Sequence, residues 1–171
     1  MIRRASPVAT FLTVLGAVGL LGSCDGDAPQ QRPLGSIPTD DLMYDHQRAG
    51  FTLAFPPVWH DRYDVDSRSG PIAAAQWPYA SHAVAFTYKP IEPDQPQPTI
   101  LTILVYRREN WNAIAADPNR PHGMPVAEQG DDVYIAAVAD TNPFPGGSRD
   151  AQHFEAMRLT IGQVKDALTL H

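Results

Sequence analysis

Residues Thr99–Tyr106 are the stretch that most restricts how this chain can fold. Their sequence, TILTILVY, is apolar on both faces of an extended chain and rich in β-branched side chains. A strand with one face in water would instead alternate apolar and polar residues, so this run is typical of a strand inside a sheet. We therefore predict a β-sheet with Thr99–Tyr106 as a central strand.

Shorter segments with alternating apolar residues supply the rest of the sheet. Phe51–Phe55 places three large apolar side chains on one face and stops at Pro56-Pro57. The other expected strands are Tyr63–Asp66, Val84–Tyr88, Met124–Gln129 and Val133–Ala139. The last two read as a hairpin across Gly130-Asp131-Asp132, and the mostly short joining loops favour antiparallel pairing.

Two segments predict helices. Arg108–Ala116 is short and ends at Asp117-Pro118, whereas Asp150–Leu170 carries one apolar stripe and could be capped by Ser148 or Asp150. The stripe consists of Phe154, Met157, Ile161, Val164 and Leu168. The expected fold class is α+β, an antiparallel β-sheet with one short helix and a long C-terminal amphipathic helix packed on it.

The N-terminal 24 residues have the layout of a secretory signal. Two arginines precede Val8–Leu21, an uncharged apolar run too short for a membrane span of roughly 20 residues. Its end, Leu21-Gly22-Ser23-Cys24, resembles the lipobox of bacterial lipoproteins. That resemblance implies cleavage before Cys24 and attachment of lipid, including an acyl chain such as palmitate, to its thiol. The alternative is an ordinary cleaved signal with a chance cysteine.

Composition and charge divide the chain into three parts. Residues 1–23 are the expected signal peptide, and residues 24–41 are the expected lipidated Cys24 with a flexible tether rich in proline. Residues 42–171 form the expected single α+β domain. The chain has 13 basic and 19 acidic residues and a net charge of −6, which argues against binding nucleic acid. Its single cysteine excludes a disulfide framework and a cysteine-rich zinc site.

The segment Phe51–Trp59, FTLAFPPVW, resembles the F-x-x-x-(F/Y)-P-x-x-W opening of PsbP-like domains. These are small α/β folds of photosynthetic extrinsic subunits and bacterial envelope lipoproteins. Their members mostly bind or assemble and share no catalytic residues. The resemblance therefore implies a PsbP-like fold and a binding role, and it transfers no site residue to this chain.

The candidate catalytic and metal-binding groups are scattered. The histidines, which show no H-x-H or H-x-x-x-H pair, are His46, His60, His82, His122, His153 and His171. A hydrolase or metal-dependent enzyme would have to gather its site from His60, His82, His122 and His153, and no G-x-S-x-G elbow is present. We predict no catalytic residue, no metal site and no cofactor.

Other polar groups also favour structural roles. Asp64 and Asp66 alternate along a strand, and Arg68 stands where a calcium loop would need the next ligand. Gly146-Gly147-Ser148 is typical of a turn that leads into a helix. Glu109 and Glu155 lie on the expected helices, where solvated carboxylates are ordinary.

Aromatic residues supply the remaining candidate site. Trp59 and Trp111 are expected in the core, whereas Trp77-Pro78-Tyr79 lies in a stretch of small residues and is the best candidate for an exposed partner contact. We therefore expect a non-enzymatic binding or assembly module, anchored by lipid on Cys24 in the bacterial cell envelope and facing the periplasm or the outside, with an envelope protein as partner. The alternatives are the enzyme above and a small-ligand carrier with a groove between sheet and helix.

Overall fold

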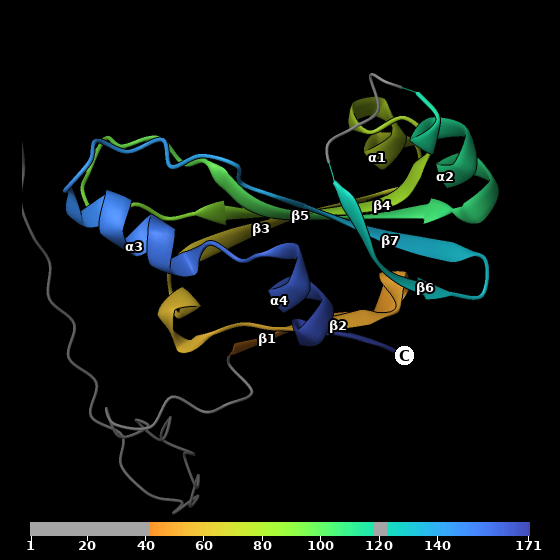
Figure 1. The fold of residues 1–171 in the computed structure, drawn as a ribbon, viewed down its shortest axis with the longest axis horizontal. Helices are drawn as coiled ribbons and strands as arrows, with labels where there is room; N and C mark the ends of the chain where they lie inside the picture. Colours follow the sequence, from red (N-terminus) through yellow and green to blue (C-terminus); the bar gives the residue numbers. More distant parts are fainter. Residues whose placement is uncertain (1–41, 118–122) are drawn as a thin grey trace, which may run out of the picture. The chain divides into compact units, whose positions relative to one another are not determined.

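The computed structural model describes residues 42–117 and 123–171, which form two antiparallel sheets (Figure 1). The larger sheet has the strand order β3-β4-β5-β7-β6, and the smaller has the order β1-β2-β8. The strands are β1 (Met43–His46), β2 (Phe51–Ala54), β3 (Tyr63–Ser69), β4 (Ala80–Tyr88), β5 (Thr99–Arg107), β6 (Met124–Gln129), β7 (Asp132–Val138) and β8 (Leu168–Leu170). The helices are α1 (Pro71–Gln76), α2 (Arg108–Ala115), α3 (Arg149–Met157) and α4 (Ile161–Ala167), with the short 3-10 helices η2 (Gln47–Ala49) and η3 (Pro57–Trp59).

Strand β5 occupies the middle of the larger sheet, as its apolar sequence predicted. All of its residues except the two at its ends are buried. Ile103 belongs to a core shared with the smaller sheet, and Leu104 belongs to a second core on the opposite face, under α1 and α2. The sheet is therefore covered on both faces in this region, which is why β5 needs apolar residues at consecutive positions.

The prediction of an α+β fold with antiparallel sheets is confirmed. The β6–β7 hairpin and helix α2 also lie where the sequence placed them. Figure 1 shows α3 and α4 on the side of the larger sheet that faces β1 and β2, and α1 and α2 at one end of its other face. The prediction missed β1, β8 and α1.

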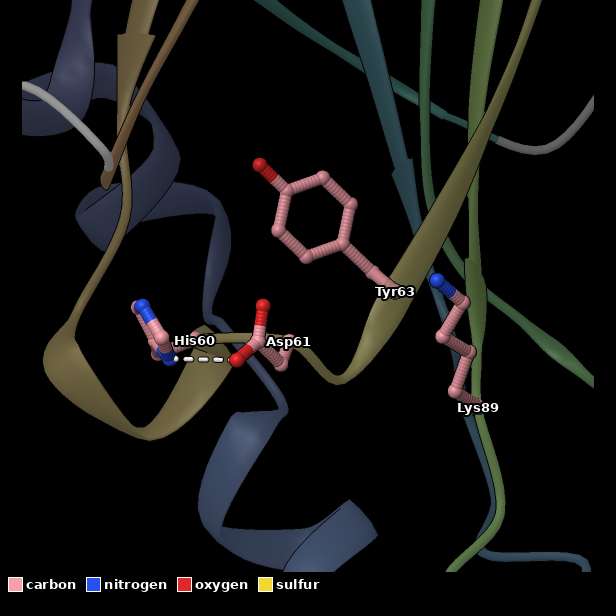
Figure 2. A pocket seen from close by; sticks show the side chains of 4 residues that line it. All are labelled: His60, Asp61, Tyr63 and Lys89. Carbon is pink, nitrogen blue, oxygen red and sulfur yellow. Dashed lines mark ion pairs between the residues drawn. The ribbon is translucent and has the colours of Figure 1, made fainter. Parts of the chain in front are cut away.

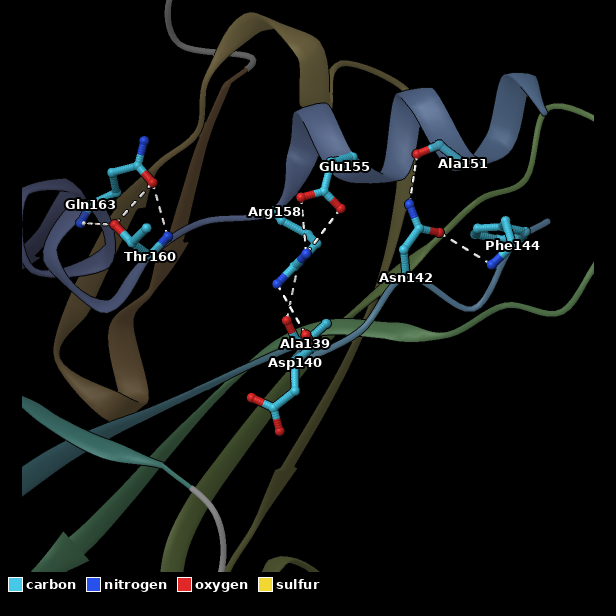
Figure 3. A network of polar contacts seen from close by, with 9 residues as sticks. All are labelled: Ala139, Asp140, Asn142, Phe144, Ala151, Glu155, Arg158, Thr160 and Gln163. Carbon is cyan, nitrogen blue, oxygen red and sulfur yellow. Dashed lines mark hydrogen bonds and ion pairs between the residues drawn. The ribbon is translucent and has the colours of Figure 1, made fainter. Parts of the chain in front are cut away.

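The prediction of one long C-terminal helix is wrong. Helix α3 ends at Met157, and Arg158 has an extended backbone with φ −61° and ψ 130°. A new helix, α4, begins after Thr160, whose hydroxyl accepts the Gln163 N–H (3.2 Å) while the Gln163 side-chain oxygen accepts the Thr160 N–H (2.8 Å). This reciprocal capping box makes a separate helix start (Figure 3). The residues after α4 form β8 and pair with β2.

The side chain of Arg158 holds the break between α3 and α4 in place. Its guanidinium donates to both carboxylate oxygens of Glu155 (2.9 Å each) and to the backbone oxygens of Ala139 and Asp140 (3.2 Å each), as Figure 3 shows. The apolar spacing survives the break, because Phe154, Met157 and Val164 all enter the same core. A continuous hydrophobic stripe therefore did not require a continuous helix.

The segment Phe51–Trp59 packs its aromatic side chains into the core between the sheets. Phe55 stacks on Trp59 with ring centroids 4.3 Å apart, and Trp59 is fully buried. The indole Nε1 of Trp59 donates to the backbone oxygen of Met157 (3.0 Å). This hydrogen bond ties η3 to the end of α3, so the expectation of a core role for Trp59 is confirmed.

Candidate interaction surface

Helix α1 and the turn after it carry the aromatic segment that the sequence singled out. Gly70 begins the helix with φ +56°, a conformation that favours glycine, and Pro71 supplies a preset first helical residue. Ala73 is fully buried in the second core. The guanidinium of Arg68 on β3 donates to the side chain of Gln76 (2.8 Å). The short helix is therefore fixed to the sheet by packing and by one side-chain hydrogen bond.

The turn at Trp77–Ala80 holds Tyr79 in an unusual backbone conformation. The Ala80 N–H donates to the backbone oxygen of Trp77 (3.0 Å), with Pro78 second and Tyr79 third in the turn. Tyr79 has φ +69°, the value that the third position of a type II turn requires and that glycine or asparagine usually supplies. A bulky residue there is rare and costs conformational energy.

The apolar surface of this segment is exposed at two points. Ile72 on α1 is 67% exposed and Tyr79 is 64% exposed. Trp77 is half-buried and packs against the second core. We call Ile72, Trp77 and Tyr79 the α1 face. The sequence singled out Trp77 and Tyr79 as a partner contact, and the structure packs Trp77 partly against the second core and leaves Tyr79 exposed.

A polar cleft of about 360 Å³ lies elsewhere, lined by His60, Asp61, Tyr63 and Lys89 (Figure 2). His60 Nδ1 lies 3.0 Å from Asp61 Oδ2, but the Asp61 side chain is 84% exposed. Lys89 Nζ pairs with Asp64 Oδ1 at 2.8 Å. Water screens ion pairs at such exposure, and the four lining residues include no serine, threonine or cysteine for the imidazole to activate. The four lining residues therefore form no Ser–His, Thr–His or Cys–His pair.

Those residues considered for metal binding that the structure describes do not converge on one site. Asp66 pairs with Arg68 on the exposed strand β3, as expected for a solvated face. His60 borders the polar cleft, His82 lies on β4 and His153 lies on α3, while His122 is outside the described residues. In residues 42–117 and 123–171, no three His, Cys, Asp or Glu side chains are placed to hold a metal ion.

Of the remaining polar candidates, Ser148 and Glu155 have structural partners. Ser148 caps α3 by accepting the Ala151 N–H (3.0 Å), which confirms one of the two expected caps. Glu155 pairs with Arg158. Glu109 lines an open hollow of about 470 Å³ whose cations are already paired, Arg107 with Asp132 and Arg108 with Glu128.

Sequence reasoning missed a buried polar cluster at the start of α3. Asp150 is 1% exposed and accepts hydrogen bonds from the Tyr88 hydroxyl (2.8 Å), the Ile91 N–H (2.6 Å) and the Glu92 N–H (3.1 Å). Burial alone would raise the pKa of Asp150, but these hydrogen bonds and the nearby Arg62 outweigh it, so its pKa is lowered. The carboxylate thus anchors the start of the proline-rich loop that follows β4.

His153 lies beside this cluster, with its ring centroid 5.9 Å from that of Tyr88. Its Nδ1 is buried and has no hydrogen-bond partner among the described residues. Burial and the positive charge of Arg62 lower the pKa of His153 below its ordinary value.

The sequence contained one signal for the buried cluster around Asp150, namely the position of that residue at a helix start. The hydrogen-bond partners of Asp150 could not be recognised, because they lie 58 to 62 residues away in the chain.

Cys24 and the expected signal peptide and tether lie outside the described residues. Within the part of the chain that is described, none of the helices has the length and apolar character needed to cross a bilayer. No protein-family model, curated protein or solved structure matches this chain.

Proposed function

We propose that this chain is a bacterial envelope lipoprotein, anchored by lipid on Cys24, whose α+β domain binds an envelope protein through the α1 face. The observation that carries the binding role is Tyr79, a large aromatic residue at φ +69° with 64% of its surface exposed. The domain acts as a binding or assembly module and not as an enzyme.

The energetics of Tyr79 support this proposal. A positive φ at a residue with a Cβ costs on the order of 1 kcal/mol, and folding recovers little of this by burial because the ring is mostly in water. Glycine would satisfy the same turn without strain. A strained position with an exposed aromatic ring is typical of a residue retained for binding, where tyrosine contributes large contact area at low entropic cost.

The rigidity of the surrounding segment supports it too. Ala73 and Trp77 fix α1 and the turn on the second core, so Ile72 and Tyr79 project from a preorganised base. A surface that is already ordered loses less entropy on association than a flexible loop. The exposed apolar residues thus have the support that a hot spot requires.

The anchoring half of the proposal rests on Leu21-Gly22-Ser23-Cys24 and on the PsbP-like segment Phe51–Trp59. The acyl chains would contribute about 0.8 kcal/mol for each buried methylene, enough for durable anchoring when two or more chains are present. A PsbP-like domain on such an anchor fits a binding role at the membrane.

Site-specific photocrosslinking in bacterial cells tests the binding role. A photoreactive phenylalanine analogue replaces Tyr79 in the full-length chain, and the matched control replaces Lys165, an exposed residue on α4. We expect one discrete crosslinked product from position 79 and none from position 165. Absence of product at position 79, or the same product from both positions, would contradict the proposed surface.

Metabolic labelling with a fatty acid tests the anchor separately. We expect the full-length chain to incorporate label and to sediment with membranes, because the Cys24 thiol is the proposed lipid acceptor. The Cys24→Ala variant is expected to lose both properties. Equal labelling of the two chains would overturn lipidation at Cys24 and leave the crosslinking result to stand alone.

A further inference from the structure

His46 joins two parts of the fold through both nitrogens of its ring. It is the last residue of β1 and the N-cap of η2, where its Nδ1 accepts the Ala49 N–H (3.0 Å). Its Nε2 lies 2.7 Å from the Ser67 hydroxyl oxygen on β3. A backbone N–H can only donate, so Nδ1 must be unprotonated and the ring proton must be on Nε2, donating to Ser67.

Ionisable and charged groups surround this ring on several elements. The His82 ring on β4 lies edge-on to it at a centroid distance of 5.9 Å. Burial, and then a charge on His46, lower the pKa of His82, while Asp132 on β7 opposes this effect and Arg48 adds to it. The other groups nearby are Tyr44, which hydrogen-bonds Ser67, Asp45, which pairs with His171 at 3.4 Å, and His171 itself.

We propose that His46 is a proton-operated latch, whose neutral imidazole holds η2 and β3 together and whose protonation releases the corner formed by β1 and η2. Binding of one proton at Nδ1 turns the acceptor of the Ala49 hydrogen bond into a second donor facing the first. The same event places a positive charge beside His82 and Arg48, and the carboxylate of the adjacent Asp45 already faces His171.

The contacts of Ala49 determine how far the loosening spreads. Ala49 is buried, and its backbone oxygen accepts the Tyr134 hydroxyl of β7 (2.8 Å). The cap at His46 therefore orders the segment that seats β1 and β2 against the larger sheet. Strand β1 is an edge strand that pairs only with β2 within its sheet, so backbone pairing retains it on one side alone. The latch is independent of the α1 face and does not rest on the proposed function.

The ring tautomer of His46 gives the first test. Long-range ¹H–¹⁵N spectra of the full-length chain at neutral pH are expected to show a protonated Nε2 and an unprotonated Nδ1. The opposite tautomer would overturn the latch, because it cannot accept the Ala49 N–H.

Amide hydrogen exchange gives the second test. When the pH is lowered from about 7.5 to about 5, we expect the protection factor of the Ala49 amide to fall by about tenfold as its hydrogen bond is lost. In His46→Asn the side-chain oxygen still caps η2 but does not titrate, so the fall is expected to disappear. Unchanged protection in the original chain, or the same fall in His46→Asn, would overturn the latch.

A control at His82 separates the two imidazoles. His82→Gln removes the neighbouring titrating ring and leaves both hydrogen bonds of His46 in place. We expect the loss of Ala49 protection at low pH to persist in this variant. Disappearance of the effect would assign it to His82 and overturn the role of His46.

Discussion

The two ends of the larger sheet differ in the kind of side chain that they bury and the kind that they expose. Figure 1 shows α3 at one end and α1 at the other. At the α3 end a charged group, Asp150, is fully buried and all of its hydrogen-bonding contacts hold the fold together. At the α1 end an aromatic group, Tyr79, is exposed on a strained backbone and contributes little to the fold. The comparison separates a buried polar group that stabilises the fold from an exposed aromatic group on which the proposed binding role rests.

The largest effect on stability is expected at the α3 end of the sheet, from removal of the Asp150 carboxylate. We expect Asp150→Ala to lower the free energy of unfolding by about 3–5 kcal/mol, because two backbone N–H groups and the Tyr88 hydroxyl lose their acceptor in a buried place. Urea unfolding of the full-length chain measures this. Asp64→Ala, which breaks the exposed pair with Lys89, is the matched control and should cost less than about 1 kcal/mol. A similar small loss in both variants would contradict the anchoring role of Asp150.

Two buried tyrosines allow a direct comparison of the two ends of the larger sheet. Tyr88 donates its hydroxyl to Asp150, whereas the Tyr106 hydroxyl in the second core is buried with no hydrogen-bond partner in the described part of the chain. Burial raises the pKa of Tyr106 to about 12. We expect Tyr88→Phe to cost about 1–2 kcal/mol and Tyr106→Phe to be neutral or slightly stabilising, since it removes a polar atom that gains nothing from burial.

The same urea titrations measure both tyrosine variants. An equal loss of stability in the two would show that the Tyr106 hydroxyl has a partner of its own. In that case the contrast between a paired and an unpaired end of the sheet would be wrong.

The sequence allowed prediction of those features that depend on neighbouring residues in the chain. Runs of consecutive apolar residues located β5 and β7, and the stop at Asp117-Pro118 located the end of α2, because these signals are local. Local sequence patterns did not reveal β1 and β8, which are short. They also did not reveal α1, because its run of alanines does not distinguish the one buried alanine, Ala73, from the others. The period of apolar side chains also joined α3 to α4, because the stripe continues while the backbone turns at Arg158.

The candidate site shows the same limit. Exposure at Tyr79 was foreseen from the small residues around it, but its strain was not, because a backbone angle leaves no mark on composition. The role of Asp150 was invisible because its partners are far away in sequence. Contacts between distant segments are made by the fold, and one sequence alone does not contain their register.

Relief of backbone strain at Tyr79 tests the α1 end of the sheet. Its expected effect on the free energy of unfolding is smaller than that of Asp150→Ala and of opposite sign. We expect Tyr79→Gly to leave the free energy of unfolding unchanged or to raise it by about 0.5–1 kcal/mol, because glycine adopts φ +69° freely and little packing is lost. Thermal unfolding of the full-length chain measures the change. A clear loss of stability would show that Tyr79 is needed for the fold and would remove the argument for a binding role.

The smallest expected effect is a pH dependence at the α3 end. The pKa of His153 is lowered in the folded chain by burial and by Arg62, so below its ordinary value near 6.5 the unfolded chain binds more protons than the folded one. Stability contributed by neutral His153 is therefore complete above about pH 6.5 and declines as the pH falls below it. Urea unfolding at a series of pH values, with His153→Gln as the control, is expected to show a shallower decline in the variant. His82 also has a lowered pKa, so part of the decline is expected to remain in both chains. An identical slope in the two chains would show that protonation of His153 does not destabilise the fold. It would also show that the α3 end is more accessible to water than the burial of the Asp150 carboxylate implies.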